Sequence, residues 1–323
     1  MSEVVGIDVA KHTLDLATPL PNGKYRTKAR LANDARGFTG LRDWLDTHAT
    51  PACWVVMEAT GSYHEAVAEF LVGLGYRVSV LNPAQVSHYA SSQLQRVKTD
   101  RVDAKLLATY GLRHLDQLRA WQPDPPALKR LRAMVRRLDD LQEMAQMERN
   151  RHEVAPASVQ ASIQQVLEHL EAEIRRLQRE IDDHIDNDPT LRQRRDLLVS
   201  IDGIAQRTAA VLLAELGDPT RFRDAGALTA FAGLNPKLHD SGKHRGHVRI
   251  SRTGSARVRR ALYMPALVAI THNPVMQAFK QRLKERGKSP KQIICAAMRR
   301  LLRFVYGILK SQQPFDPVKA VAH

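Results

Sequence analysis

The sequence contains little of several features, and each shortage excludes a class of protein. Only two of its 323 residues are cysteine, Cys53 and Cys295, and both lie in apolar segments. A disulfide framework is therefore excluded, and a reducing compartment is favoured. The N-terminus has no signal-peptide pattern, and the most apolar stretch, residues 261–270, is about half as long as the ~20 residues that span a membrane. We expect a cytoplasmic protein with no membrane partner.

Aromatic residues are also few, at 5% of the chain, so base stacking is not expected to be the main mode of nucleic-acid binding. Positive charge is abundant instead, and it is unevenly distributed. Net charge is +2 over residues 1–120, −3 over residues 121–187 and +16 over residues 188–323. Because the excess is confined to one folded region, contact with nucleic acid explains it better than a general effect on solubility does.

Residues 1–115 have the pattern of an α/β domain, in which short strands alternate with helices. Apolar runs between turn residues predict strands at 3–9, 13–18, 24–32, 53–58 and 76–81. Helical spacing and cap residues predict helices at 35–48, 63–74, 83–92 and 101–114, with Asn33 or Asp34 as the cap of the first.

Four carboxylates in this domain are candidates for a metal site. Asp8 lies in the first predicted strand, Glu58 closes the fourth, and Asp100 and Asp103 open a helix that Thr99 can cap. An acid in a buried strand needs a partner, and two acids three positions apart on a helix repel unless a cation neutralises them. Mg²⁺ prefers oxygen ligands, and paired Mg²⁺ ions can assist phosphodiester cleavage. The plainer interpretation of the helical pair is a capped first turn whose acids face the helix dipole.

Residues 116–188 have apolar residues at helical spacing. After a break at Pro156, a second helix, with Ser158 as its predicted cap, has a nearly heptad seam that consists of Ile163, Leu167, Leu170, Ile174, Leu177, Ile181 and Ile185. This seam predicts either an amphipathic helix that packs within its own domain or an intermolecular coiled coil that forms a dimer. A domain boundary follows at residues 187–189, where Asn-Asp-Pro is typical of a turn.

The C-terminal region contains two candidate nucleic-acid elements. Residues 197–213 resemble a helix-hairpin-helix, whose turn offers N–H groups to a DNA phosphate, although Ala205 replaces the second turn glycine and a packing role is as well supported. Residues 237–260 contain eight Lys or Arg and one acid, which suits a DNA backbone. The candidate contacts there are Lys243, Arg245, Arg249 and Arg252, and the candidate nucleophiles are Ser241, Ser251 and Ser255, although a loop serine is usually a turn residue.

Six ordered pieces of the chain carry a family resemblance. They are Gly6-Ile7-Asp8, Glu58-Ala59-Thr60-Gly61, residues 98–104, residues 230–234, Asp240-Ser241-Gly242 and residues 259–266. Together they resemble the transposases of the IS110 family of insertion sequences, which are D-E-D-D recombinases guided by a bridge RNA. The order of strands, helices and acids also resembles the ribonuclease H fold in its RuvC-like form. A competing match of Gly6-Ile7-Asp8 to actin-like ATPases lacks the further phosphate loops of that family.

The resemblance implies three parts: a RuvC-like domain with a trailing helix over residues 1–150, a coiled-coil oligomerisation segment at 158–187, and a mostly helical, basic transposase domain at 190–323. It implies that Asp8, Glu58, Asp100 and Asp103 bind Mg²⁺ or another divalent metal. It also implies that Ser241, once activated, attacks a DNA phosphate and forms a covalent phosphoserine. The implied partners are donor and target DNA, a bridge RNA encoded by the element, and further copies of the chain in a homodimer or homotetramer whose protomers share active sites.

Two other functions remain open at this stage. A RuvC-type metal-dependent endonuclease or Holliday-junction resolvase would use water as its nucleophile, and Ser241 would have no catalytic role. A non-catalytic nucleic-acid-binding protein would keep the four acids as structural groups. A covalent protein–DNA adduct separates the recombinase from the endonuclease, and loss of metal dependence favours the binding protein.

Overall fold

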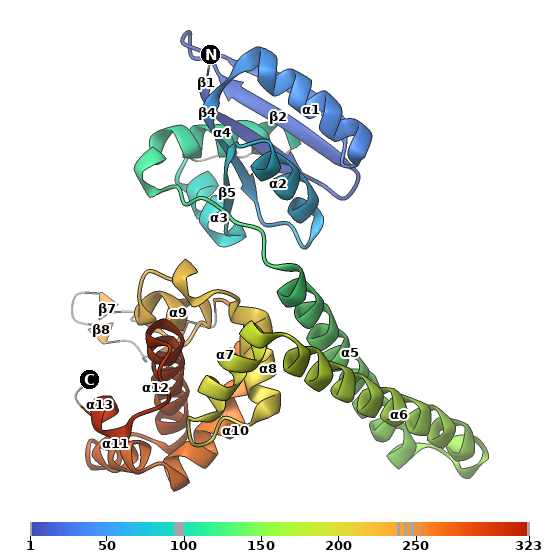
Figure 1. Ribbon diagram of the computed structural model, residues 1–323, viewed down its shortest axis with the longest axis vertical. Helices are drawn as coiled ribbons and strands as arrows, with labels where there is room; N and C mark the ends of the chain where they lie inside the picture. The colour runs from blue at the N-terminus through green and yellow to red at the C-terminus, as the bar shows by residue number, and fades with distance from the viewer. Residues whose placement is uncertain are drawn as a thin grey trace. The chain divides into compact units, whose positions relative to one another are not determined.

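The computed structural model describes residues 2–93, 100–237, 240–241, 244–245, 249–251 and 253–321. The chain divides into two compact units, Met1–Pro123 and Asp124–His323 (Figure 1). The first unit is an α/β domain and the second is mostly helical, as the sequence predicts.

A five-stranded mixed sheet forms the centre of the first unit. Its strands are β1 (Ser2–Val9), β2 (Thr13–Pro19), β3 (Tyr25–Ala32), β4 (Ala49–Glu58) and β5 (Arg77–Leu81), in the spatial order β3-β2-β1-β4-β5. β1 pairs antiparallel with β2 and parallel with β4, and β4 pairs parallel with β5. Since β1 and β4 are adjacent and parallel, their carboxyl ends meet at one edge of the sheet.

The helices of the first unit are α1 (Ala35–His48), α2 (Tyr63–Gly73), α3 (Pro83–Ser92) and α4 (Asp100–Arg113), followed by the short 3₁₀ helix η1 (Leu115–Gln117). These bounds confirm the predicted helices to within one residue at each end. Asp34 caps α1, since its carboxylate accepts a hydrogen bond from the N–H of Gly37 at 3.0 Å. Thr99, the predicted cap of α4, lies outside the described residues.

Each face of this sheet buries its own apolar cluster. On one face, Val5, Ile7 and Met57 pack with residues of α1 and α2. On the other face, Val4 and Val56 pack with residues of α3 and α4. Because side chains alternate along a strand, Gly6 and Asp8 of β1 and Glu58 of β4 share the face that α4 covers.

Helix α4 lies on β1 in direct backbone contact. A Cβ atom on Gly6 would lie 2.2 Å from the carbonyl oxygen of Ala104 and 2.5 Å from the amide nitrogen of Ala108. One turn further along α4, a Cβ atom on Gly111 would lie 2.8 Å from the side chain of Val4. The helix therefore runs antiparallel to β1, and its first turn, with Asp100 and Asp103, lies toward the end of β1 that carries Asp8.

The second unit contains nine helices within the described residues. They are α5 (Pro126–Val154), α6 (Ala157–Asn187), α7 (Pro189–Val199), α8 (Gln206–Leu216), α9 (Ala225–Phe231), α10 (Ala256–His272), α11 (Pro274–Glu285), α12 (Pro290–Ser311) and α13 (Pro317–Val321). The 3₁₀ helix η2 (Pro219–Arg221) and four two-residue strands, β6 (Pro236–Lys237), β7 (Asp240–Ser241), β8 (His244–Arg245) and β9 (Arg249–Ile250), complete it. In the described part of the chain, no helix is both long enough and apolar enough to cross a membrane.

Helices α5 and α6 form an antiparallel hairpin (Figure 1). Leu177, Ile181 and Ile185 of the predicted seam are buried in one core with residues of α5 such as Leu131 and Leu138. The seam of α6 is therefore filled within the chain over this half. Helix α5 packs against α6 and α8, and the two compact units divide before it.

The predicted cap of α6 was wrong. The helix begins at Ala157, so Ser158 lies inside its first turn, and Pro156 occupies the cap position without a side-chain hydrogen bond. Pro156 has φ −64° and ψ 150°, which is the ordinary proline conformation and leads directly into a helix.

We predict that Gly6→Ala destabilises the first unit by about 1–3 kcal/mol, because the added methyl group overlaps the backbone of α4. Gly73→Ala, at the end of α2, is the matched control. Apart from its chain neighbours and the backbone of α2, no atom of the described residues lies within 4 Å of its Cβ position, so the free energy of unfolding should change by less than about 0.5 kcal/mol.

All three tryptophans, Trp44, Trp54 and Trp121, lie in the first unit. Urea unfolding followed by tryptophan fluorescence therefore reports this unit alone. Equal midpoints for Gly6→Ala and wild type would contradict the backbone contact.

Candidate active site

Asp8 and Glu58 lie side by side at the carboxyl edge of the sheet. The parallel ladder pairs Ile7 of β1 with Met57 of β4. The residues that follow them, Asp8 and Glu58, are therefore neighbours across the two strands. Both side chains are partly buried, and both take part in interactions within the structure. The two strands that the sequence analysis predicted to carry these acids therefore bring them together.

Asp103 reaches the same region from α4. It precedes Ala104, whose carbonyl oxygen lies against Gly6, and its side chain is partly buried. Asp100 is the first residue of α4, and its side chain lies outside the described residues. Since residues three apart share a helix face, the backbone places Asp100 and Asp103 on one side of α4.

Asp15 is a fifth carboxylate, which the sequence analysis missed. It pairs directly with Asp8 in the antiparallel ladder of β1 and β2, and such partners have Cβ atoms about 4.5–5.5 Å apart on the same face. Its side chain is only 5% exposed. Two acids facing each other repel, so Asp15 makes this edge of the sheet a better site for a cation. In the sequence, an acid between Leu14 and Leu16 in a predicted strand could have indicated that Asp15 belongs to the site.

The donor atoms at this edge fit a hard divalent cation, because every candidate ligand is a carboxylate oxygen. Among the described side chains, no three acids, histidines or cysteines converge closely enough to hold a metal ion. Asp100, one of the four predicted ligands, is not among those side chains. The backbone places Asp8, Glu58 and Asp103 on the face of the sheet that α4 covers, and Asp100, the fourth predicted acid, is the first residue of that helix.

Ser241 lies in a short hairpin of the second unit. β7 and β8 pair Asp240 with Arg245 and Ser241 with His244. The side chain of Ser241 lies outside the described residues. The predicted DNA contacts lie outside them as well, since Lys243 and Arg252 are not described and only the backbones of Arg245 and Arg249 are.

The base of this hairpin is anchored to α9. Pro236 of β6 pairs with Ile250 of β9, and the N–H of Ser251 donates to the carbonyl oxygen of Asn235 at 2.9 Å. The side chain of Asn235 accepts a hydrogen bond from the hydroxyl of Thr229, a fully buried residue of α9, at 2.7 Å. The segment that carries Ser241 therefore begins and ends on a fixed support.

Comparison with known proteins identifies the family. A transposase family described as DEDD type, IS110, matches residues 5–155, and one described as the IS116/IS110/IS902 transposase family matches residues 195–281. The pilin gene-inverting protein of Moraxella bovis is 34% identical over 97% of this chain and 97% of its own. The transposase for insertion element IS1328 of Yersinia enterocolitica is 26% identical over 82% of this chain and 83% of its own.

The chain belongs to the IS110 family of transposases. It is a DNA recombinase, an enzyme that cleaves and rejoins DNA. The DEDD description of the matching family implies a divalent metal, in agreement with the all-carboxylate edge of the sheet.

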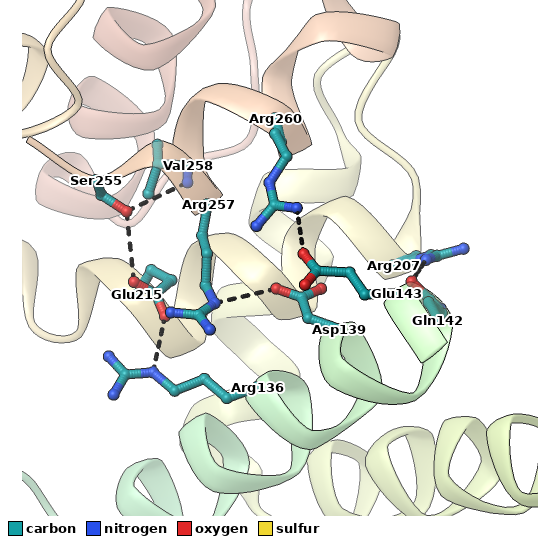
Figure 2. A network of polar contacts seen from close by, with 10 residues as sticks. All are labelled: Arg136, Asp139, Gln142, Glu143, Arg207, Glu215, Ser255, Arg257, Val258 and Arg260. Atoms are coloured by element: carbon teal, nitrogen blue, oxygen red, sulfur yellow. Dashed lines mark hydrogen bonds and ion pairs between the residues drawn. The ribbon is translucent and has the colours of Figure 1, made fainter. Parts of the chain in front are cut away.

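Ser255, one of the two competing serines, has a structural role in this transposase (Figure 2). It caps α10, since its hydroxyl oxygen accepts a hydrogen bond from the N–H of Val258 at 3.3 Å, and it donates to Glu215 at 3.4 Å. Glu215 also accepts from Arg136 of α5 at 3.2 Å. A serine in these contacts serves the packing of α5, α8 and α10.

Two of the eight basic residues counted between 237 and 260 also belong to this network. Arg257 pairs with Asp139 at 3.1 Å and Arg260 with Glu143 at 2.7 Å (Figure 2). The Arg260 guanidinium lowers the pKa of Glu143 through a hydrogen bond. These ion pairs hold the first turns of α10 against α5, so their arginines contribute to the fold of the basic region.

The helix-hairpin-helix-like segment consists of α7, a turn and α8. Gly203 has φ +101°, and a Cβ atom there would lie 2.7 Å from the carbonyl oxygen of Pro265 in α10. The N–H of Ile204 donates to the carbonyl oxygen of Ile201 at 2.9 Å, and both isoleucine side chains are buried. The turn is therefore pressed against α10, and of the two roles that the sequence left open the geometry supports packing.

A buried histidine lies next to the acidic edge. His64, in the first turn of α2, follows Glu58 by six positions and is 8% exposed. Asn33 connects the end of β1 to this turn by donating to the carbonyl oxygens of Ala10 at 3.0 Å and Tyr63 at 3.1 Å. Burial lowers the pKa of His64 below 6.5, although the nearby Glu65 acts to raise it.

The lowered pKa of His64 predicts a dependence of stability on pH. The unfolded chain accepts a proton near pH 6.5, whereas the folded protein resists it, so the stability from neutral His64 is present above that pH and is lost as the pH falls through the lowered folded pKa. The free energy of unfolding of the first unit should fall between about pH 7 and 5.5, and we predict a smaller fall in His64→Gln than in wild type. His88→Gln, at an exposed site, should leave this loss unchanged.

Urea unfolding followed by tryptophan fluorescence at the two pH values measures this loss. The same pH dependence in His64→Gln as in wild type would show that another group causes it.

Proposed function

We propose that this enzyme is an RNA-guided transposase in which Asp8, Glu58, Asp100 and Asp103 bind a divalent metal and Ser241 is the nucleophile. The observation that carries the proposal is the convergence of β1, β4 and the first turn of α4 at one edge of the sheet in a chain of the DEDD-type IS110 family. The strand order and the helix across β1 also support a RuvC-like ribonuclease H fold for the first domain.

The four carboxylates would hold Mg²⁺, which supplies neutralisation of charge on the phosphate during cleavage. The fold itself contributes by holding together carboxylates that repel one another. Hydrogen bonding in the ladder fixes Asp8 beside Glu58, and the absence of a side chain at Gly6 lets the backbone of α4 lie close against β1. Such fixed ligands lose little entropy when a metal binds.

We propose that Ser241 attacks the phosphorus of the DNA strand. The Oγ–P bond forms as the bond from phosphorus to the leaving deoxyribose oxygen breaks; a carboxylate base takes the serine proton, and the leaving oxygen gains a proton as it departs. The phosphoserine conserves the energy of the broken phosphodiester, so a hydroxyl of another DNA end can rejoin by the reverse step. Lys243, Arg245, Arg249 and Arg252 would neutralise phosphate charge around the hairpin.

With a bridge RNA as the guide, the protein itself would not need to recognise most of the DNA sequence. Base pairing between RNA and the donor and target strands would then select the sites, and the protein would bind backbones. The net charge of +16 over residues 188–323 supports such contacts, in the part of the chain that we assign to the transposase domain, residues 190–323.

Oligomerisation through the α5–α6 hairpin is part of the same proposal. Beyond the packed part of the hairpin, apolar side chains are exposed around the turn: Met147 is 52% exposed, Val154 84% and Val159 44%. A second copy of the chain would bury them in a homodimer or homotetramer. Residues 158–187 would then serve two purposes, packing against α5 near the core and against another copy at the tip.

Inversion of a DNA segment is the second candidate function. The relatives that are 34% identical over 97% of this chain, from Moraxella bovis and Moraxella lacunata, are named pilin gene-inverting proteins, whereas the transposases of IS1328 and IS1111A are 26% and 24% identical. Inversion requires the same cleavage and rejoining between two sites on one DNA molecule. The same residues would therefore carry out either reaction.

We predict that wild-type protein, given cognate RNA, labelled DNA and Mg²⁺, forms a DNA adduct that protease removes on a denaturing gel. Ser241→Ala should lose this adduct, because alanine lacks the Oγ atom that forms the bond to phosphorus. Ser251→Ala is the matched control, since the anchoring contact of Ser251 to Asn235 uses its backbone N–H.

Strand cleavage without an adduct, unchanged in Ser241→Ala, would identify water as the nucleophile and favour a RuvC-type endonuclease or junction resolvase. DNA inversion, the second candidate function, is tested by the same reaction on a plasmid that carries two sites in inverted orientation. The measurement is whether the DNA segment between the two sites has reversed its direction.

A further inference from the structure

A cavity of about 650 Å³ opens in the second unit, lined by residues of α11, α12 and the segment that leads into α13. Its volume is typical of small-ligand sites, which range over about 300–1,000 Å³. It shares no residue with the hairpin of Ser241 and none with the acidic edge of the sheet. In Figure 1, α11 and α13 lie beside α12 near the C-terminus.

Three arginines of α12 line this cavity: Arg299, Arg300 and Arg303. Burial lowers the pKa of Arg300, and the positive charges of Arg282 and Arg303 lower it further. The Nε atom of Arg299 is buried and has no hydrogen-bond partner among the described residues. Asp316 is the one acid among the described lining residues, and Lys319 lies 3.9 Å from it. The cavity therefore carries excess positive charge and favours an anion.

Aromatic rings form the other walls. Phe279, Phe304 and Phe315 all line the cavity, which is three of the seven phenylalanines in a chain that is only 5% aromatic. The rings of Phe304 and Phe315 lie 5.1 Å apart at an angle of 50°. The guanidinium of Arg300 lies over Phe279 at 4.8 Å. A ligand here meets flat apolar surfaces and guanidinium groups together.

We infer that this cavity binds one unpaired nucleotide of a single strand, with its phosphate on Arg299 and Arg303 and its base against Phe304 and Phe315. A free phosphate would leave the aromatic rings exposed to water, and an apolar side chain would form no ion pair with Arg299 or Arg303. A nucleotide matches both, because every base has a π face and every nucleotide a phosphate. The inference rests on the proposed function only in taking nucleic acid as the ligand.

The test uses the full-length protein in EDTA, so that it does not depend on cleavage or on Ser241. Two probes, 12-mers of deoxythymidine and of uridine, each with one 5-iodouracil, are crosslinked by light, and mass spectrometry identifies the modified residue. Affinity is measured at one salt concentration for wild type, Phe315→Leu, Arg303→Gln and Lys284→Gln. The leucine keeps the apolar packing of Phe315 and removes its π face. Lys284 is an exposed base of α11 outside the cavity, so its variant controls for net charge.

We expect crosslinks at Phe279, Phe304 or Phe315, and binding about tenfold weaker in Phe315→Leu, within the range for loss of one stacked base. Arg303→Gln should weaken binding more than Lys284→Gln does. A preference for the uridine probe would indicate that RNA is the source of the nucleotide, and a preference for the thymidine probe would indicate DNA. Crosslinks only outside the cavity, or Phe315→Leu with wild-type affinity for both probes, would overturn the inference and leave the nucleophile test unaffected.

Discussion

The close approach of two backbones, α4 on β1 at Gly6, is the constraint on which the acidic site depends. A side chain at Gly6 would lie 2.2 Å from the carbonyl oxygen of Ala104, so only glycine lets the helix rest on the strand. Asp103 adjoins this contact, and Asp8 lies two residues further along β1. The ladder then sets Glu58 and Asp15 on either side of Asp8. One small residue thus determines how closely acids from a strand and from a helix approach, and with it whether their charges can share a cation.

Most of the first unit could be predicted from its sequence, because its elements are short and sharply bounded. The turn near Gly23 and the Asn82–Pro83 step end strands where the structure ends them. Asp8 and Glu58 could be placed near the ends of buried strands because apolar runs lead into both of them. Asp15 could not be assigned to the site, because its pairing with Asp8 depends on the register between strands, which local pattern does not determine.

The second unit was less predictable because its contacts join distant parts of the chain. A heptad seam shows that α6 packs against a helix but does not say which one, and Leu177 and Ile181 proved to face α5. Charge counting included Arg257 and Arg260 in the basic excess of residues 237–260, whereas both pair with acids of α5 more than a hundred positions away. The phenylalanines of the cationic cavity are scattered from 279 to 315, so no local pattern shows that they meet.

Isothermal titration of the metal-free protein with Mn²⁺ measures whether the carboxylates at the sheet edge bind a divalent metal. We predict that wild type and Asp43→Asn bind Mn²⁺ with the same affinity, since Asp43 is an exposed residue of α1 paired with Arg42. Asp8→Asn and Glu58→Gln should each bind at least about tenfold more weakly, because each removes a charged oxygen ligand. Wild-type affinity in both Asp8→Asn and Glu58→Gln would show that these carboxylates are not ligands and that the metal binds elsewhere.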